Sequence, residues 1–389
     1  MNRVVITGIG CRTPLGNNYN LVKQSFLQGK HGTKQDIFGS SAYVVEEDID
    51  SNFDRFDLNI TDRFTRLAWL SYKDAINDSA NYPEGIFLGV GYGVGAISYE
   101  ESYRSLFAKG KVKPTALICS VVNMGSNFIA LKDNLKGPAF TYSTACSSSS
   151  TAIGEAYKKI SYGEHDCLAA GGSEACINEL QFAFWKAMNS LSTDCKPFPK
   201  NRNGITMSEG SVIFILENYD KAVARGANIY CEIVGYGVSN GSESVTKPNT
   251  EGQIKCMSLA LKDHDIQEVT YINAHGTGTP IGDLVELKSI ENIFGKYTSE
   301  IPISSTKGLH GHLFGASGAI ETLACITTLE NNSIIPNWNL DEKDTDISSN
   351  IFLPTQPLYN KQKIVLNNSF GFGGTNITLA FKRNIDENK

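Results

Sequence analysis

The chain has 389 residues, of which 41% are hydrophobic and 20% are charged. That length and composition describe an ordinary globular protein, which can bury a large core as one α/β unit or as two intimate halves. Thirty-five basic against 41 acidic side chains leave a formal charge of −6, which excludes a global basic field for nucleic acid. An acidic partner would therefore need a local basic patch.

Cysteine spacing and hydropathy exclude two further classes of protein. The nine cysteines are odd in number and show no C-x-x-C pair or finger-like spacing, so neither a disulfide framework nor a structural zinc site is expected. The run from Met1 to Gly8 is short and β-branched, unlike a signal peptide, and no window approaches the roughly 20 apolar residues of a membrane helix. We therefore expect no membrane span and a cytoplasmic location.

Short apolar runs that end near glycine alternate with helical patterns along the chain, which is typical of layered α/β folds. Between two of these runs, apolar residues from Ala152 to Ile160 keep one helical face. The predicted strands are Val4–Ile6, Ile86–Val90, Leu168–Ala170, Val212–Leu216, Ile233–Val234, Tyr271–Ile272 and Ile364–Leu366.

The order of these elements indicates an internal duplication. The echoed segments are Arg3–Ile9 with Cys231–Val238, and Phe87–Gly93 with Tyr271–Gly278. In this scheme Cys146 corresponds to His312, and each opens a helix rich in small residues. We predict a divide near residue 228, with halves 1–228 and 229–389 that share one packed interface.

Cys146 lies between an apolar stretch that ends near Tyr142 and a helical pattern that begins near Thr151. A thiol at a helix N-terminus feels the positive end of the helix dipole and unpaired backbone N–H groups, which lower its pKa and favour the thiolate. Ala145 and the serines that follow Cys146 leave room for a thioester-sized substrate. The plain alternative is a packed core cysteine, as most free cysteines are, and position alone leaves both open.

Two histidines lie in loops of small residues that suit a site. His275 is in a strand-end loop where glycines let the backbone approach a ligand and threonines offer hydroxyls, and His312 is in a second such loop. Each alone is more often structural, but with Cys146 they supply a nucleophile and two imidazoles for a carbonyl group. His310 is a rival that composition does not exclude. The expected surface histidines are His31, His165 and His264.

Several motifs, in a fixed order, carry a resemblance that runs from end to end. They are Ile6–Gly10 with Thr13–Gly16, Thr144–Cys146, Gly204 with Glu209–Gly210, His275–Asp283, Ser305–Lys307, Gly311–His312 and Asn368–Asn376. Each motif alone is weak, but their number and order are specific. The chain resembles the β-ketoacyl-acyl carrier protein synthases, in the elongating branch of the thiolase superfamily. This resemblance implies an α/β, thiolase-like, duplicated five-layer αβαβα fold.

The resemblance also implies a decarboxylative Claisen condensation. Cys146 would accept an acyl chain from the phosphopantetheine thiol of an acyl carrier protein. Malonyl-carrier protein would then lose carbon dioxide and attack the Cys146 thioester, which adds two carbons. His275 and His312 would donate to the malonyl thioester oxygen, and the backbone N–H groups of Cys146 and Phe372 would form an oxyanion hole. No intrinsic cofactor and no metal are expected, since the phosphopantetheine belongs to the carrier.

Further residues match supporting positions of that family. Lys307 and Glu321 match a charged pair, with Asp283 and Glu286 as acids that would help to orient the histidines. Without the resemblance, ordinary surface charges would be the simpler interpretation. The expected substrate-binding residues are Thr246, Thr277, Thr279, Gly371 and Gly373. The threonines would hold the malonyl carboxylate, and the alternative is that they only stabilise turns. Phe372 is the expected gate of the acyl pocket, and the glycines would let its loop approach the substrate.

Three stretches depart from the family pattern. Arg202–Ile205 and Ser208–Gly210 replace Arg-Asp-Gly-Phe and Gly-Glu-Gly, and Gly241–Ser244 replaces an Asp-Ala-Tyr-His that faces the gate. Such substitutions can alter gating without altering the chemistry. We therefore expect a specialised aryl-polyene or polyketide-type pathway, with a housekeeping fatty-acid elongating enzyme as the alternative.

The resemblance implies two protein partners. One is the acidic acyl carrier protein, for which the expected contact is a basic patch of Lys196, Lys200 and Arg202, although a solvated basic face explains those charges almost as well. The other is a second chain, either an identical copy or a chain-length-factor homologue that lacks the cysteine. The apolar segment Leu117–Met124 is the expected dimer surface, and a core segment is its alternative.

Two interpretations from other classes stay open. A non-catalytic chain-length factor would be a structural and specificity subunit, but the presence of Cys146, His275 and His312 favours the catalytic member. A degradative thiolase normally uses a second catalytic cysteine near the C-terminus, where this chain has Asn368–Gly374. A Cys-His-His site is therefore favoured over a Cys-His-Cys site.

Overall fold

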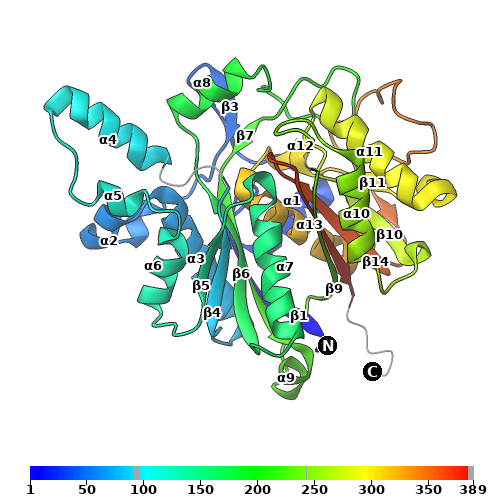
Figure 1. Ribbon diagram of the computed structural model, residues 1–389, viewed down its shortest axis with the longest axis horizontal. Coiled ribbons are helices and arrows are strands. Elements are labelled where there is room, and N and C mark those ends of the chain that lie inside the picture. Colours follow the sequence, from blue (N-terminus) through cyan, green and yellow to red (C-terminus); the bar gives the residue numbers. More distant parts are fainter. Residues whose placement is uncertain (92–95, 242, 384–389) are drawn as a thin grey trace.

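The computed structural model describes residues 1–91, 96–241 and 243–383, and a mixed ten-stranded sheet runs through it (Figure 1). The strand order is β11-β10-β14-β15-β9-β1-β8-β6-β4-β5. These strands are β1 (Val4–Arg12), β4 (Gly85–Gly89), β5 (Ala139–Tyr142), β6 (Cys167–Glu174), β8 (Gly210–Asn218), β9 (Cys231–Asn240), β10 (Val269–Asn273), β11 (Ile303–Ser304), β14 (Ile364–Phe370) and β15 (Thr375–Lys382). Two small sheets pair β2 (Lys34–Ile37), β3 (Ser40–Tyr43) and β7 (Met207–Ser208), and β12 (Ser333–Ile334) with β13 (Leu358–Tyr359).

The large sheet has two matching halves. In the first, β4 is parallel to both β5 and β6, and β8 links β6 to β1 through antiparallel pairs. In the second, β10 is parallel to both β11 and β14, and β15 links β14 to β9 in the same way. The halves meet where β1 and β9 pair antiparallel, with Val4 opposite Ile233. This symmetry confirms the predicted duplication; Tyr92 and Gly93 of one echoed segment lie outside the described residues.

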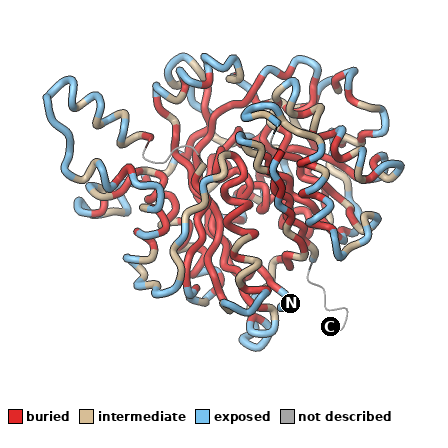
Figure 2. The backbone as a smooth tube through the Cα atoms, in the orientation of Figure 1, coloured by how far each residue is buried: buried red, intermediate tan, exposed pale blue. Residues whose placement is uncertain are grey.

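Helices and the two halves of the sheet alternate in five layers. The outer helices are α3 (Arg63–Ser79) and α6 (Met124–Lys132) on the first half, and α10 (Thr250–Ala260) and α11 (Pro280–Phe294) on the second. Between the halves, α7 (Ser148–Ser161) packs against α13 (Ser317–Asn331). Their crossing needs small residues, because a Cβ on Gly318 would lie 2.0 Å from Ser150 Oγ. The strands and central helices are the buried part of the molecule (Figure 2), and the predicted αβαβα fold is confirmed.

The register of the duplication differs from the sequence prediction. A 3-10 turn, η2 (Ala145–Ser147), precedes α7, and a second such turn, η5 (Phe314–Ala316), precedes α13. When these two junctions are matched element by element, Cys146 corresponds to Gly315. The predicted correspondence of Cys146 with His312 is therefore wrong by three residues, because His312 precedes the turn that Cys146 occupies.

One group of helices extends from the body. In Figure 1, α4 (Ala96–Lys109) and α5 (Ala116–Cys119) project at the left, and Figure 2 shows α4 as largely exposed. Leu117 is 77% exposed, and several of its apolar neighbours up to Val122 are also exposed, so the core alternative for this segment is wrong. None of the described helices is long and apolar enough to cross a membrane. The remaining helices are α1 (Tyr19–Gln28), α2 (Arg55–Ile60), α8 (Glu179–Ala187), α9 (Tyr219–Ala224), α12 (Lys307–His310), η1 (Asp50–Asn52), η3 (Ile266–Glu268) and η4 (Gly295–Ser299).

Candidate active site

Cys146 occupies the η2 turn between β5 and α7. Ala145, just before it, has φ 52°, in the left-handed region that side chains rarely adopt. Ser148 holds this turn, since its hydroxyl accepts the Thr144 N–H at 2.9 Å and donates to the Ala145 carbonyl at 2.6 Å. Strained backbone held by surrounding contacts is typical of functional sites.

The environment of the thiol differs from the sequence prediction. Cys146 is 7% exposed, and burial raises the pKa of its thiol to about 12, while the nearby Lys307 ammonium acts in the opposite direction. The expectation of a lowered pKa is therefore wrong for the site without substrate, because loss of water outweighs the helix N-terminus. The site without substrate therefore favours the thiol over the thiolate.

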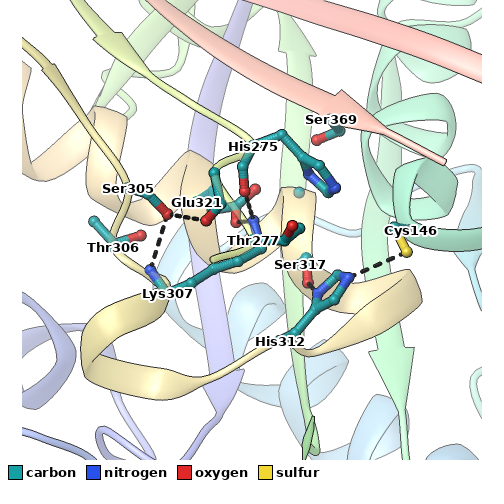
Figure 3. Close-up of polar contacts among 12 residues, drawn as sticks. Cys146, His275, Thr277, Ser305, Thr306, Lys307, His312, Ser317, Glu321 and Ser369 are labelled. Carbon is teal, nitrogen blue, oxygen red and sulfur yellow. Dashed lines mark hydrogen bonds and ion pairs between the residues drawn. The ribbon is translucent and has the colours of Figure 1, made fainter. Parts of the chain in front are cut away.

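His312 faces the sulfur from the second half of the chain (Figure 3). Its Nε2 lies 3.1 Å from Cys146 Sγ, and the Phe314 N–H donates to its Nδ1 at 3.3 Å. Because a backbone N–H can only donate, Nδ1 is the unprotonated nitrogen and the neutral ring carries its hydrogen on Nε2. Burial lowers the pKa of His312 well below its usual value, which keeps the ring neutral. His312 is thus a hydrogen-bond donor toward the sulfur.

His275 follows β10 and lies beside His312, with 5.7 Å between the two ring centroids. Its backbone N–H donates to Glu286 at 2.8 Å, and Lys307 Nζ donates to its carbonyl at 2.5 Å. Burial lowers the pKa of this ring as well. Two neutral imidazoles therefore face one space near the sulfur.

The ligand atoms of Cys146, His275 and His312 all lie within 4.8 Å of one another, a spacing that a metal ion can use. The hydrogen bond from Phe314 does not fit that use, because a metal-binding Nε2 must have its lone pair free. With its hydrogen on Nε2, His312 suits a developing negative charge on oxygen or sulfur instead.

The predicted supporting residues are buried beneath the site. Lys307 and Glu321 form an ion pair in which both side chains are fully buried, so the alternative of ordinary surface charges is wrong. Glu286 accepts the N–H groups of His275 and Gly276, each at 2.8 Å, and burial raises its pKa to about 7. Asp283 accepts two further N–H groups, from Phe198 and Gly278. These acids fix the loop that carries His275.

A cavity of about 400 Å³ opens onto the three residues. Thr277 and Thr279 line it with their hydroxyls 3.0 Å apart, and the exposed Thr246 lines it from another segment. Gly371 also lines it, whereas Gly374 does so in place of the predicted Gly373. The cavity therefore combines hydroxyl donors with an apolar wall that includes Met188, Ile205 and Phe370.

Phe372 lies in the loop between β14 and β15 and is 42% exposed. Its ring stacks on Trp185 of α8, with centroids 5.9 Å apart. The loop is tied to the segment after β9, since Gly373 N–H donates to the Val245 carbonyl and Gly241 N–H to the Gly374 carbonyl, each at 2.8 Å. Ser242, within one of the stretches that depart from the family pattern, lies outside the described residues.

The predicted basic patch is only partly at the surface. Arg202 is 6% exposed and donates to Asp344 at 2.5 Å, so its assignment to a surface patch is wrong. Lys200 is exposed, and Lys196 is half-buried with Asp341 3.6 Å away. The arginine holds separate chain segments together, because its guanidinium also donates to the backbone carbonyls of Pro199, Thr279 and Pro280.

His310, the rival imidazole, is not in the site. It is fully buried, its Nε2 lies 3.1 Å from Thr306 Oγ1, and its ring packs edge-on against Phe26. His31 is exposed, and the other two expected surface histidines, His165 and His264, are half-buried; all three are outside the cluster.

Sequence reasoning missed three residues around the site. Ser317 lies 2.8 Å from His312 Nδ1, Trp185 stacks on Phe372, and the buried Glu174 accepts the N–H groups of Gly91 and Gly315. Ser317 carried a usable signal, since a serine at the start of a helix five residues after a candidate histidine is within reach of its ring. The contacts of Trp185 and Glu174 depend on tertiary folding and left no local signal.

Fold and site together define a Cys-His-His acyltransferase of the thiolase-like class. Residues 1–222 match the N-terminal domain model of β-ketoacyl synthases, and residues 230–341 match the C-terminal domain model. The chain belongs to the β-ketoacyl synthase family.

Known proteins agree with this membership over nearly the whole chain. The chain is 34% identical to 3-oxoacyl-[acyl-carrier-protein] synthase 2 of Staphylococcus aureus over an alignment of 407 positions, which covers 98% of each chain. It matches the structure of the ishigamide ketosynthase/chain length factor with a TM-score of 0.92 and 28% identity, over 99% of this chain and 100% of that one. It also matches the structure of a type II polyketide ketosynthase that is bound to the hexaketide and in complex with its acyl-carrier protein. That match has a TM-score of 0.89 and 26% identity, and it covers 98% of this chain and 100% of the other.

Proposed function

We propose that this chain is the catalytic β-ketoacyl-acyl carrier protein synthase of a specialised aryl-polyene or polyketide-type pathway. The observation that carries the chemistry is the approach of His312 Nε2 to Cys146 Sγ, with His275 beside them at one cavity. A nucleophile and two neutral imidazole donors are what acyl transfer followed by decarboxylation requires.

In the first half-reaction, Cys146 Sγ attacks the thioester carbonyl of an acyl-carrier protein. The C–S bond to the carrier's phosphopantetheine breaks as the new C–S bond forms, and the thiol proton of Cys146 leaves with the carrier sulfur. The proton and the acyl group thus exchange in one event, which suits a thiol whose pKa burial has raised. The Nε2–H of His312 stabilises the sulfur while it carries negative charge.

In the second half-reaction, malonyl-carrier protein loses carbon dioxide, and its α-carbon attacks the Cys146 thioester. His275 and His312 donate to the malonyl thioester oxygen as charge develops on it. Thr246, Thr277 and Thr279 hold the malonyl carboxylate before it leaves. The C–S bond to Cys146 breaks as the new C–C bond forms, so the products are a β-ketoacyl chain two carbons longer on the carrier and a Cys146 thiolate, which takes up one proton from water.

The acyl oxygen needs an oxyanion hole of its own, and we assign it to the N–H groups of Cys146 and Phe372. Gly371 N–H and Gly373 N–H on either side of Phe372 are engaged with Thr375 and Val245. The Phe372 N–H has no acceptor among the described residues, so it is available to a substrate oxygen. Release of the Phe372 ring from Trp185 would open the acyl pocket beneath it.

The carrier protein and a second chain complete the assembly. Lys196 and Lys200 remain the proposed contact for the acidic carrier, and its phosphopantetheine is the only prosthetic group in the scheme. The exposed apolar residues Leu117 and Val121, with Phe140 on the edge strand β5, support a dimer surface. Sedimentation of a Phe140→Asp variant should show a smaller species than the unaltered chain shows.

Loading of Cys146 tests the function and the pathway together. Mass spectrometry should detect acylation of Cys146 by unsaturated or aryl acyl-carrier proteins, followed by elongation with malonyl-carrier protein. The assay is run with and without candidate chain-length-factor partners. A chain that loads only ordinary saturated groups would support the housekeeping enzyme instead, and one that never loads would support a non-catalytic subunit.

A further inference from the structure

Ser317, the first residue of α13, contacts a residue of the site. Its Oγ lies 2.8 Å from His312 Nδ1, and both side chains are buried (Figure 3). The hydroxyl has no other hydrogen-bond partner among the described residues, and α13 has no side-chain cap. Its contact with the ring is therefore not a by-product of helix capping.

The direction of this hydrogen bond follows from a second donor. The Phe314 N–H already points at the same nitrogen, 3.3 Å away, and an N–H group at Nδ1 would face it donor to donor. The serine hydroxyl, which can donate or accept, is thus the donor here. Two donors on Nδ1 fix the hydrogen of the neutral ring on Nε2, the atom that lies 3.1 Å from Cys146 Sγ.

The matching position in the first half of the fold shows that this use is particular to Ser317. Ser148 is the first residue of α7, and its hydroxyl stays within its own turn, between Thr144 N–H and the Ala145 carbonyl. The neighbouring His275 also differs, because its Nδ1 has no partner among the described residues. Of the two matching serines, only Ser317 lies within hydrogen-bonding distance of the ring of a catalytic histidine.

We propose that Ser317 is a positioning residue that holds His312 as the Nε2–H tautomer, aimed at Cys146 and at the malonyl oxygen. This inference rests on the proposed condensation for its role, but the tautomer itself is a property of the resting protein. Without the hydroxyl, only the longer bond from Phe314 orients the ring, and the Nδ1–H tautomer becomes accessible. That tautomer presents a lone pair where the reaction needs a donor.

The test combines a spectroscopic signature with turnover. Histidine-selective ¹⁵N labelling and long-range ¹H–¹⁵N correlation report which ring nitrogen of His312 carries the hydrogen, and the signal is assigned by its loss in His312→Asn. We expect Nε2–H in the unaltered chain and a mixture in Ser317→Ala, with condensation reduced about five- to tenfold, the equivalent of one hydrogen bond. Ser317→Thr, which keeps the hydroxyl, should restore both, and Ser317→Cys, a weaker donor of similar size, should be intermediate. Ser148→Ala is the matched control and should leave the His312 tautomer unchanged.

Three results would overturn the proposal. These are an Nδ1–H ring in the unaltered chain, an unchanged tautomer in Ser317→Ala, or equal losses of turnover in the Ala and Cys variants while the ring stays Nε2–H. Circular dichroism verifies that each variant is folded. Acylation of Cys146 in the unaltered chain is measured separately, so a failure of the proposed function is distinguishable from a failure of this inference.

Discussion

The two junctions at the centre of the molecule have the same backbone and different chemistry. Each is a 3-10 turn that leads into a central helix, and each has a non-glycine residue in the left-handed region, Ala145 with φ 52° and Phe314 with φ 47°. In the first, the middle residue of the turn is Cys146. In the second it is Gly315, where a Cβ would lie 2.0 Å from the Gly91 nitrogen.

The difference shows that the two halves of the duplicated fold supply different parts of the site. The first turn presents a side chain to the cavity, whereas the second turn packs tightly and places His312 just ahead of it. Glu174, at the end of β6 in the first half, accepts the Gly315 N–H at 2.8 Å and so holds the second turn against the first half of the sheet. Neither half alone has both the nucleophile and the donors, which makes the contact between halves part of the site.

The largest effect is expected when the first junction is made like the second. Cys146→Gly removes the nucleophile, and we expect acylation to be undetectable and turnover to fall at least about 10⁴-fold. Intact-protein mass spectrometry after incubation with acyl-carrier protein measures this. Cys325→Ala, a buried cysteine on α13, is the matched control and should still load. Loading of the Cys146→Gly chain at another cysteine would contradict the assignment.

The next largest effect concerns the Lys307–Glu321 ion pair, which supports only the part of the site that comes from the second half of the chain. Lys307→Met leaves Glu321 buried without its partner, and we expect the free energy of unfolding to fall by about 3–5 kcal/mol. The double variant Lys307→Met/Glu321→Leu should recover most of this stability, since no charge is then stranded. It should not recover condensation, because Lys307 Nζ also holds the His275 carbonyl. Urea denaturation and turnover assays separate the two roles, and a fully active double variant would refute this function of the lysine.

A smaller effect separates the two imidazoles. His275→Ala should lower condensation by about 10²–10³-fold, the cost of one donor to a developing oxyanion, and leave the loading of Cys146 within a few-fold of normal. His312→Ala should impair both steps, because its Nε2 contacts the sulfur as well. Single-turnover acylation and malonyl-dependent turnover, measured in parallel, give the comparison. Equal losses in both steps for His275→Ala would contradict it.

The smallest effect is a change in pH dependence from the histidine outside the cluster. Burial lowers the pKa of His310 to about 3, so between that value and the usual 6.5 the unfolded chain binds more protons than the folded one. Stability from this group is complete above pH 6.5 and declines as pH falls, by up to about 1.4 kcal/mol per pH unit. His310→Asn should therefore reduce the slope of unfolding free energy between pH 6 and pH 4. An unchanged slope in denaturant titrations would contradict this cause.

Local apolar periods predicted a layered α/β fold and motifs of small residues indicated Cys146, His275 and His312 as candidates, while the family resemblance placed these three residues in one site. They mispredicted properties that depend on distant partners. The sequence pattern indicates a surface charge at Arg202, yet its side chain is buried and donates to Asp344, 142 positions along the chain. The helix that follows Cys146 predicts a low pKa for its thiol, but burial raises that pKa, and His312 of the opposite half is one of the residues in contact with the sulfur. The register of the duplication was mispredicted because Gly315 and Cys146 occupy equivalent backbone positions in their turns but have no side-chain chemistry in common.

The position of β1 has a consequence for how the chain is made. This strand is synthesised well before its two neighbours, β8 and β9, because Val4 pairs with Asn218 on one side and with Ile233 on the other. At about 5–20 residues per second, roughly 10–45 s pass between the synthesis of Val4 and that of Ile233. Until β8 and β9 are made, the apolar strand lacks both of its hydrogen-bonding neighbours, and of the elements that pack against it only those made earlier, such as α3, can cover it.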